Sequence, residues 1–112
     1  MRERKSGVII NVSSTASFQP IPYMATYAAT KAFVTSFSQA IAEENRQFGI
    51  TVTALCPGPT ETNFFAAANA IPFSAKGMQT SEDVVDKALS AVRKRKPLTV
   101  SGVSNYIGSV LG

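Results

Sequence analysis

Histidine is absent from the 112 residues, and cysteine occurs once, at Cys56. Without histidine, the chain cannot build a Ser-His-Asp or Cys-His catalytic centre or a histidine-ligated metal site. A single cysteine forms neither an intramolecular disulfide nor a cysteine-based metal cluster. Any proton transfer that the chain performs must therefore use Tyr, Lys, Asp, Glu or water.

Long apolar runs are absent as well. No stretch of about 18 apolar residues occurs, so we expect no membrane span. The charged N-terminus is not followed by the long apolar core and cleavage site of a signal peptide, which makes the cytoplasm the expected compartment. With 45% hydrophobic and 16% charged residues, the composition is that of an ordinary globular domain. The length suits one small domain.

Positive charge is in slight excess, with a formal net charge of +4. The excess comes partly from Arg2, Arg4 and Lys5 and partly from the basic run at residues 93–96. Neither cluster is interleaved with aromatic residues, so a nucleic-acid-binding module is the weakest of the functions that we consider. The run at residues 93–96 suits the C-terminal end of a helix, where cations interact favourably with the helix dipole.

The sequence alternates between strand-like and helix-like segments. Short apolar and β-branched runs predict strands at residues 8–12, 50–56 and 98–100, and apolar periodicity predicts helices at residues 24–48 and 81–94. A strand–helix–strand order requires a parallel strand pair joined by a right-handed crossover. The first run is apolar on both faces, as in a central strand of a parallel sheet. One α/β domain over residues 1–112 is therefore predicted.

Two segments have two interpretations each. Within the long helix, Phe33, Val34, Phe37 and Ile41 form an apolar stripe that belongs either to the core or to an interface. The connection at residues 60–79 is long enough to be functional, for example as a lid. The alternative is a flexible surface loop, in which exposed aromatic side chains would need to be covered.

Tyr27 and Lys31 are the strongest candidates for chemistry. They lie four residues apart at the start of the long helix, so their side chains share one helix face. A nearby ammonium stabilises an ionised phenolate, which lets a tyrosine exchange a proton near neutral pH as a general acid–base. The plain alternative is a solvated lysine beside a half-buried tyrosine.

Two further groups flank this pair in the sequence. Ser13, Ser14 and Thr15 follow the first strand, and ligands of open α/β sheets lie just beyond the carboxyl ends of strands. Turn formation alone would also explain hydroxyl groups at this position. After the second strand, Pro57 and Gly58 end the extended chain abruptly.

The order of these motifs resembles the C-terminal half of a short-chain dehydrogenase/reductase. The likeness rests on a strand ending in Ser13 and Ser14, a helix with Tyr27 and Lys31, and a second strand ending in a Pro-Gly turn. It extends from residue 7 to about residue 100. It implies the C-terminal part of a doubly wound Rossmann-type parallel sheet and an NAD(P)-dependent oxidoreductase that interconverts a carbonyl and an alcohol.

The resemblance also implies catalytic roles. Ser14, rather than Ser13, would polarise the substrate carbonyl or hydroxyl. Tyr27 would be the acid–base, giving a proton in reduction and taking one in oxidation. Lys31 would support the ionised form of Tyr27 and hold the ribose of the nicotinamide, so both residues also count as cofactor-binding.

The turn after the second strand is implied to hold the cofactor too. Pro57, Gly58, Thr60 and Thr62 would orient the nicotinamide carboxamide, and residues 63–79 would form the substrate lid. A small molecule with a carbonyl or alcohol group is the implied substrate. The helix face at residues 33–41 would pack against a second copy in a homo-oligomer.

Some parts of the family pattern have no counterpart in this sequence. No glycine-rich turn follows a strand, and the residue that selects NAD or NADP in the family is absent. The asparagine of the family's catalytic set is absent too, since Asn11 lies within a strand and does not replace it. We therefore expect the catalytic half of such an enzyme, with a binding site for the nicotinamide portion of the cofactor alone. The alternative is a non-catalytic remnant that folds by itself or pairs with a full-length relative. An upstream glycine-rich turn in the same reading frame would distinguish the two.

Overall fold

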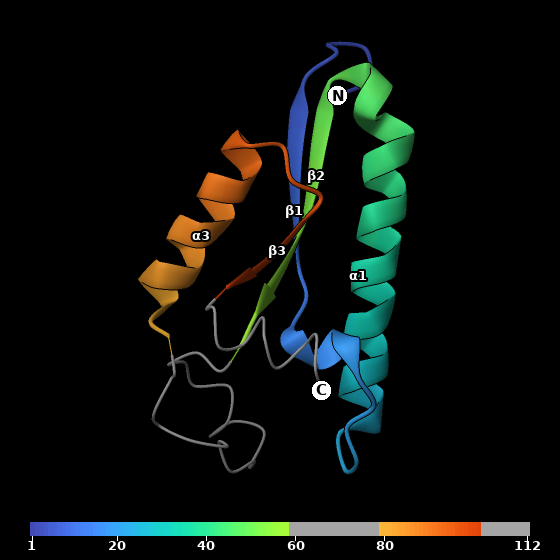
Figure 1. Ribbon diagram of the computed structural model, residues 1–112. Coiled ribbons are helices and arrows are strands. Elements are labelled where there is room, and N and C mark those ends of the chain that lie inside the picture. The colour runs from blue at the N-terminus through green and yellow to red at the C-terminus, as the bar shows by residue number, and fades with distance from the viewer. Residues whose placement is uncertain (59–78, 102–112) are drawn as a thin grey trace.

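The sheet at the centre of the fold has three parallel strands. The structure, a computed structural model, describes residues 1–58 and 79–101. The strands are β1 (Gly7–Val12), β2 (Ile50–Pro57) and β3 (Leu98–Ser101), and they lie in the order β1-β2-β3. Because all of them are parallel, their carboxyl ends meet at one edge of the sheet, as Figure 1 shows.

The register brings the strand ends close together. Val12 is paired with Leu55, and Pro57 is paired with Ser101. The first residue after β1, Ser13, donates its backbone N–H to the Leu55 carbonyl at 2.7 Å. The residues that follow β1 and β2 are thus neighbours in space.

Helices connect these strands in the predicted α/β order, which is confirmed. A short 3₁₀ turn, η1 (Thr15–Phe18), follows β1 and leads to the long helix α1 (Ala25–Asn45). Another 3₁₀ turn, η2 (Arg46–Phe48), ends this helix, and α3 (Ser81–Arg93) precedes β3.

The helix ends show why these segments form where they do. Gly49 follows η2 at a φ of 71°, and a Cβ at this position would meet the Lys5 carbonyl, so glycine is required for the turn into β2. Thr80 caps α3 by accepting a hydrogen bond from the Asp83 N–H at 3.1 Å. Acidic Glu82 and Asp83 lie in the first turn of α3, where they complement the helix dipole.

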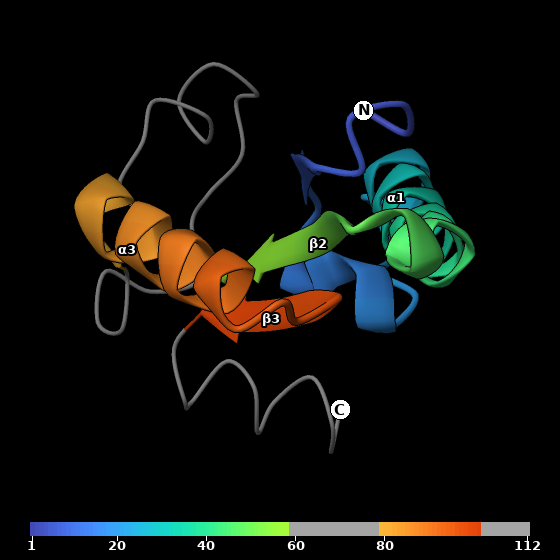
Figure 2. The ribbon, with the colours of Figure 1, turned by 90° about the horizontal axis from the view of Figure 1, so that it is seen from above.

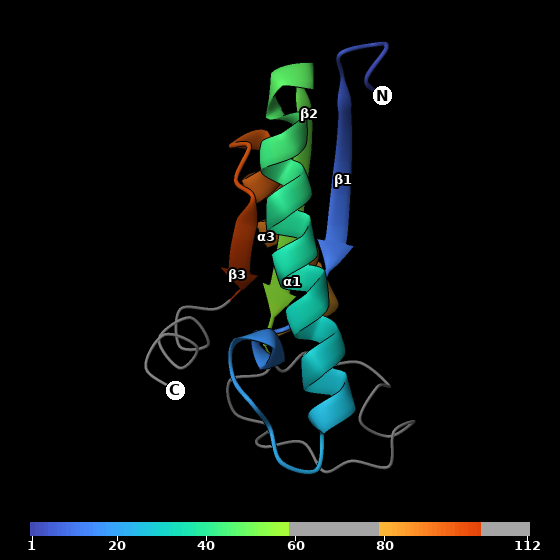
Figure 3. The ribbon, with the colours of Figure 1, turned by 90° about the vertical axis from the view of Figure 1, so that its right-hand side faces the viewer.

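α1 and α3 cover opposite faces of the sheet (Figures 1, 2 and 3). Figure 3 views the sheet from the α1 side, with the strands pointing downward and β2 to the left of β1. When the view is turned so that the strands point upward, β2 lies to the right of β1, and the first connection is therefore right-handed, as predicted. The second connection advances the sheet in the same direction, from β2 to β3, but its helix lies on the other face. Its hand is therefore the opposite one, which is rare for parallel strands.

β2 is the central strand of the described sheet. Covered on both faces, it contains Val52 at 2% exposure and Ala54 and Cys56 at 0%. β1 lies at the edge, in contrast to the central position that its apolar character predicts. The side chains on one face of β1 are covered by α1, whereas Val8 and Val12 on the other face are 49% and 57% exposed.

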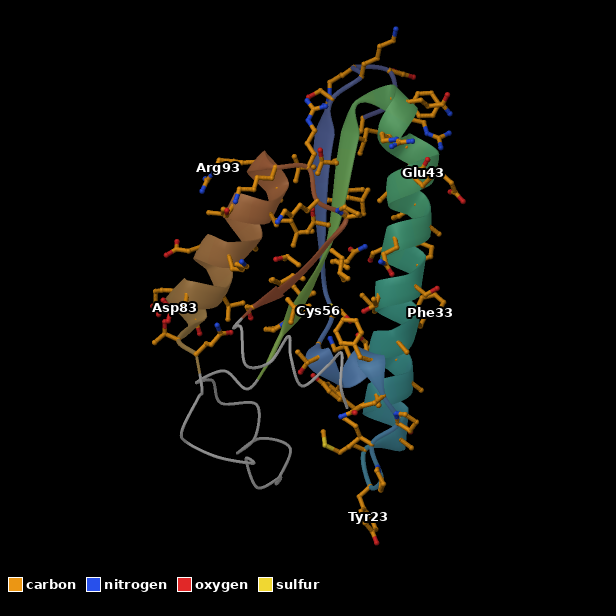
Figure 4. The ribbon with its side chains drawn as sticks, viewed as in Figure 1. Tyr23, Phe33, Glu43, Cys56, Asp83 and Arg93 are labelled. Carbon is orange, nitrogen blue, oxygen red and sulfur yellow. The ribbon has the colours of Figure 1, made fainter. Side chains whose placement is uncertain are left out.

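The two phenylalanines of the apolar stripe of α1 point away from the sheet, whereas Val34 and Ile41 are half-buried. Phe33 and Phe37 are 66% and 49% exposed, and their rings stack with centroids 5.6 Å apart and planes at 9°. Figure 4 shows Phe33 on the outer side of the helix. Small side chains instead face the sheet, namely Ala28, Thr35 and Ser38. The core interpretation is therefore wrong for Phe33 and Phe37, for which the interface interpretation is left.

α3 is fastened to the sheet through an apolar cluster. Leu55 of β2 packs with Val84 and Ala88 of α3, and all three are buried. Val85 and Leu89, on the flank of the helix, are 52% and 44% exposed. Among the described residues, none of the helices has both the length and the apolar character that crossing a membrane requires.

Candidate active site

Tyr27 and Lys31 lie on the first turns of α1, beside the carboxyl end of β1. Both side chains are half-buried. The Lys31 ammonium donates a hydrogen bond to the Val12 carbonyl at 3.1 Å and lies 5.7 Å from the centroid of the Tyr27 ring. The helix face that carries the pair is thus held against the strand end that leads into Ser13 and Ser14.

The two serines after β1 have different surroundings. Ser13 is 2% exposed, and its hydroxyl donates to the Lys31 carbonyl at 2.9 Å. Ser14 is half-buried and caps η1, since the Ala16 N–H donates to its Oγ at 3.0 Å. That bond uses a lone pair of the Ser14 oxygen and leaves its O–H proton to be donated. Ser14 can therefore form the turn and still offer a hydrogen bond to a ligand.

The turn after β2 begins at the same edge of the sheet as the two serines. Pro57 ends β2, and both Pro57 and Gly58 are half-buried. Thr60, Thr62 and residues 63–78 of the expected lid lie outside the described residues. Gln79, at the end of that segment, accepts a hydrogen bond from the Ser101 hydroxyl at 2.6 Å.

These groups fit the ribose and nicotinamide portion of a dinucleotide. An ammonium has three donors, and the Val12 carbonyl takes one of those of Lys31, which leaves two for ribose hydroxyls. Gly58, which has no side chain, follows β2 at the same edge of the sheet. Within residues 1–58 and 79–101, no glycine-rich turn is present to hold a pyrophosphate. The same residues contain no group of three or more His, Cys, Asp or Glu suited to a metal ion.

A buried polar cluster behind the site was missed from the sequence. Thr35 and Ser38 continue the helix face of Tyr27 and Lys31, and Ser38 accepts a hydrogen bond from the Asn11 amide at 2.9 Å. Positions 27, 31, 35 and 38 follow helical spacing, which is the signal that could have identified the cluster. Asn11 is therefore occupied in holding β1 to α1.

Cys56 joins the same cluster from the end of β2, and Figure 4 places it between the sheet and α1. Its thiol lies 3.7 Å from the Thr35 hydroxyl. Burial raises the pKa of the Cys56 thiol above its ordinary value of 9.0, against an opposing effect of hydrogen bonds from Thr35, Ser17 and Ser13. Cys56 is thus a neutral, buried thiol at neutral pH.

An apolar groove of about 580 Å³ lies beside the N-terminal turns of α1. Its lining is drawn from residues 17–22 and from alanines of α1. Ser14, Tyr27 and Lys31 do not belong to this lining, so the groove is separate from the candidate site.

The fold and site together define a Rossmann-type α/β protein with a Tyr/Lys helix at the carboxyl edge of its sheet. A sequence profile for short chain dehydrogenases matches residues 1–71. The chain belongs to this family.

Relatives and solved structures agree with this assignment. The chain is 33% identical over 112 residues to the very-long-chain 3-oxoacyl-CoA reductase of Rattus norvegicus, covering 98% of this chain and 34% of that protein. A short-chain dehydrogenase from Sphingobium yanoikuyae in complex with NADPH superposes with a TM-score of 0.80 at 31% identity, over 88% of this chain and 39% of the other. A 3-oxoacyl-[acyl-carrier protein] reductase from Brucella melitensis with bound NAD gives 0.70 at 28% identity, over 89% and 40%. The chain thus spans less than half the length of these proteins.

Proposed function

We propose that this chain carries the catalytic part of a nicotinamide-dependent oxidoreductase that interconverts a carbonyl and an alcohol. The observation that supports this most strongly is the placement of Lys31, whose ammonium is held by the Val12 carbonyl at the end of β1 and lies 5.7 Å from the centroid of the Tyr27 ring. The relatives, which are reductases and dehydrogenases, favour this activity over a non-catalytic remnant.

In this proposal the protein orients the reactants and moves one proton. Ser14 donates its O–H to the substrate oxygen, and Tyr27 gives a proton to that oxygen in reduction or takes it in oxidation. Lys31 holds the ribose hydroxyls with the donors that the Val12 carbonyl leaves unused. A nicotinamide nucleotide, when bound, supplies or accepts the hydride. Pro57, Gly58, Thr60 and Thr62 would orient its carboxamide.

We also propose a substrate class and a cofactor. The rat relative and the Brucella structure are named as 3-oxoacyl reductases, so a 3-oxoacyl thioester is the first substrate to test. Both NADPH and NAD occur in the similar structures, and both reduced nucleotides therefore belong in the assay.

A second copy of the chain is the partner that we propose for α1. The exposed stack of Phe33 and Phe37 offers a flat apolar surface on the side of the helix away from the sheet. Such a surface suits an antiparallel helix pair between two copies.

The activity is tested with the native gene product, whose intact mass is measured first. Turnover of a 3-oxoacyl thioester is then followed with NADH and NADPH. Replacing Tyr27 by Phe should lower turnover by roughly 10²–10⁴-fold, the usual share of a general acid–base, with cofactor affinity largely unchanged. Lys31→Ala should weaken both turnover and cofactor affinity.

Tyr23→Phe is the matched control, because Tyr23 is fully exposed just before α1 and should not affect turnover. Near-wild-type turnover of the Tyr27→Phe variant would overturn the role of Tyr27. Absence of turnover in the wild-type native product with either nucleotide would overturn the substrate assignment.

A further inference from the structure

One buried hydroxyl, that of Thr35, contacts three other elements of the fold. Thr35 is 7% exposed on α1. Its Oγ1 lies 2.6 Å from the Ser13 Oγ, where either hydroxyl can donate. It donates to the Ser17 Oγ at 2.9 Å, and it lies 3.7 Å from the Cys56 Sγ. The contacts therefore reach the end of β1, the turn η1 and the end of β2.

Two of these partners are attached to the proposed hydrogen-bond donor, Ser14. Ser13 precedes it in the chain and also donates to the Lys31 carbonyl at 2.9 Å. Ser17 lies within η1, and its N–H donates to the Ser14 carbonyl at 3.0 Å. Any displacement of Ser13 or Ser17 would thus move Ser14.

The remaining contacts reach the other parts of the proposed site. Cys56 directly precedes Pro57, at the start of the turn proposed to face the nicotinamide. Thr35 itself lies one helical turn after Lys31, on the same face of α1. The segments that carry Ser14, Lys31 and Pro57 are therefore joined at one atom, the Thr35 Oγ1.

The polarity of this cluster needs an explanation beyond packing. Apolar side chains of similar shape fill such an interior at little loss of stability, whereas hydrogen bonds fix the direction and spacing of the groups that they join. Every buried side-chain nitrogen and oxygen in the described residues has a hydrogen-bond partner. Because each hydroxyl has one proton, Ser13 donates either to the Lys31 carbonyl or to Thr35 at a given moment, and the cluster is a network of alternating hydrogen bonds among closely spaced oxygen atoms.

We propose that Thr35 is a positioning residue that fixes the spacing of Ser14, the Tyr27/Lys31 helix face and the Pro57 turn through its bonds to Ser13, Ser17 and Cys56. This inference rests on the proposed function for the meaning of that spacing. The network itself can be tested without any turnover.

The test measures backbone amide hydrogen exchange by NMR on the full chain. Thr35→Val keeps the shape of the side chain and removes the hydroxyl, and Thr35→Ser keeps the hydroxyl. The amides of Ala16 and Ser17, which bond to Ser14, should exchange at least tenfold faster in the Val variant, and Ser should restore the wild-type rates.

Thr53→Val is the matched control. Thr53 is also buried, on β2, and its hydroxyl donates to the Lys96 carbonyl at 2.7 Å, away from the network. Removal of the Thr53 hydroxyl should leave the hydrogen-exchange rates of the Ala16 and Ser17 amides unchanged. Equal rates in the Val and Ser variants at position 35, or equal acceleration by Thr53→Val, would overturn the proposal.

If Thr35→Val does not fold, Ser17→Ala tests the same point, since it removes the Thr35–Ser17 bond to η1, together with the contact of Ser17 with the Cys56 thiol, and leaves the Thr35 hydroxyl in place. Faster exchange at Ala16 supports the proposal, and unchanged exchange overturns it. In the native product, Thr35→Val should lower kcat at least tenfold while the KM for the nucleotide changes less than twofold, with recovery in Thr35→Ser. Absence of turnover in the wild type would overturn the proposed substrate assignment, whereas the exchange result would still decide whether Thr35 holds η1.

Discussion

The stack of Phe33 and Phe37 allows the proposed self-association to be tested quantitatively. An aromatic side chain can bury about 200 Å². With 66% and 49% of these residues exposed, the pair offers about 230 Å² per chain. At about 25 cal/mol per Å², burying it in both copies contributes about 12 kcal/mol, against an association cost of about 4–15 kcal/mol. The calculated gain and the association cost are of similar size, so loss of the two rings should shift the equilibrium strongly toward the monomer.

Sedimentation velocity over a range of concentrations measures the dimer dissociation constant. Replacing Phe33 and Phe37 by Gln should raise it at least a hundredfold, because a quarter of the calculated gain, about 3 kcal/mol, already corresponds to that factor. Val85→Gln with Leu89→Gln is the control, since these residues of α3 are 52% and 44% exposed. A monomeric wild type, or an equal effect of the control, would refute the reasoning.

Two further predictions concern stability, both measured by urea denaturation. Leu55→Ala should lower the free energy of unfolding by about 2–5 kcal/mol, because Leu55 is 5% exposed and joins β2 to α3. A loss below 1 kcal/mol would contradict this role. Cys56 should make the fold sensitive to alkaline pH. Burial raises the pKa of Cys56 in the folded state, so the thiol of the unfolded chain ionises at a lower pH than that of the folded chain. The free energy of unfolding therefore falls as the pH rises above the ordinary pKa of the thiol. Cys56→Ala should lose less stability than the wild type between about pH 8 and pH 10, and equal losses would count against the burial effect.

Short-range sequence features were sufficient to predict the helices and strands. The β-branched run of β2, the hydroxyl cap and acids of α3 at Thr80, Glu82 and Asp83, and the stop at Gly49 all lie where the structure uses them. The shared face of Tyr27 and Lys31 also followed from helical spacing. Such features depend on residues within one or two turns of each other, which is why the sequence reveals them.

Features that depend on distant residues could not be predicted in this way. The close approach of α1 to the sheet selects small side chains such as Ala28 and Ser38, so Phe33 turns outward although its hydrophobicity suggested the core. The face of the sheet that α3 covers is not encoded in its own periodicity. The contacts of Thr35 with Ser17 and Cys56 join residues 18 and 21 positions away in the chain.

The position of β1 at the edge couples the candidate site to whatever lies beside the strand. Among the described residues, β1 pairs only with β2, so the backbone groups along its other edge have no strand partner. Ser13 and Ser14 directly follow this strand. A strand that paired with the open edge would restrain the backbone from which these hydroxyls project. By thermodynamic reciprocity, a ligand that orders Ser14 would in turn favour the pairing, so sheet extension and ligand binding would be measured as one coupled equilibrium.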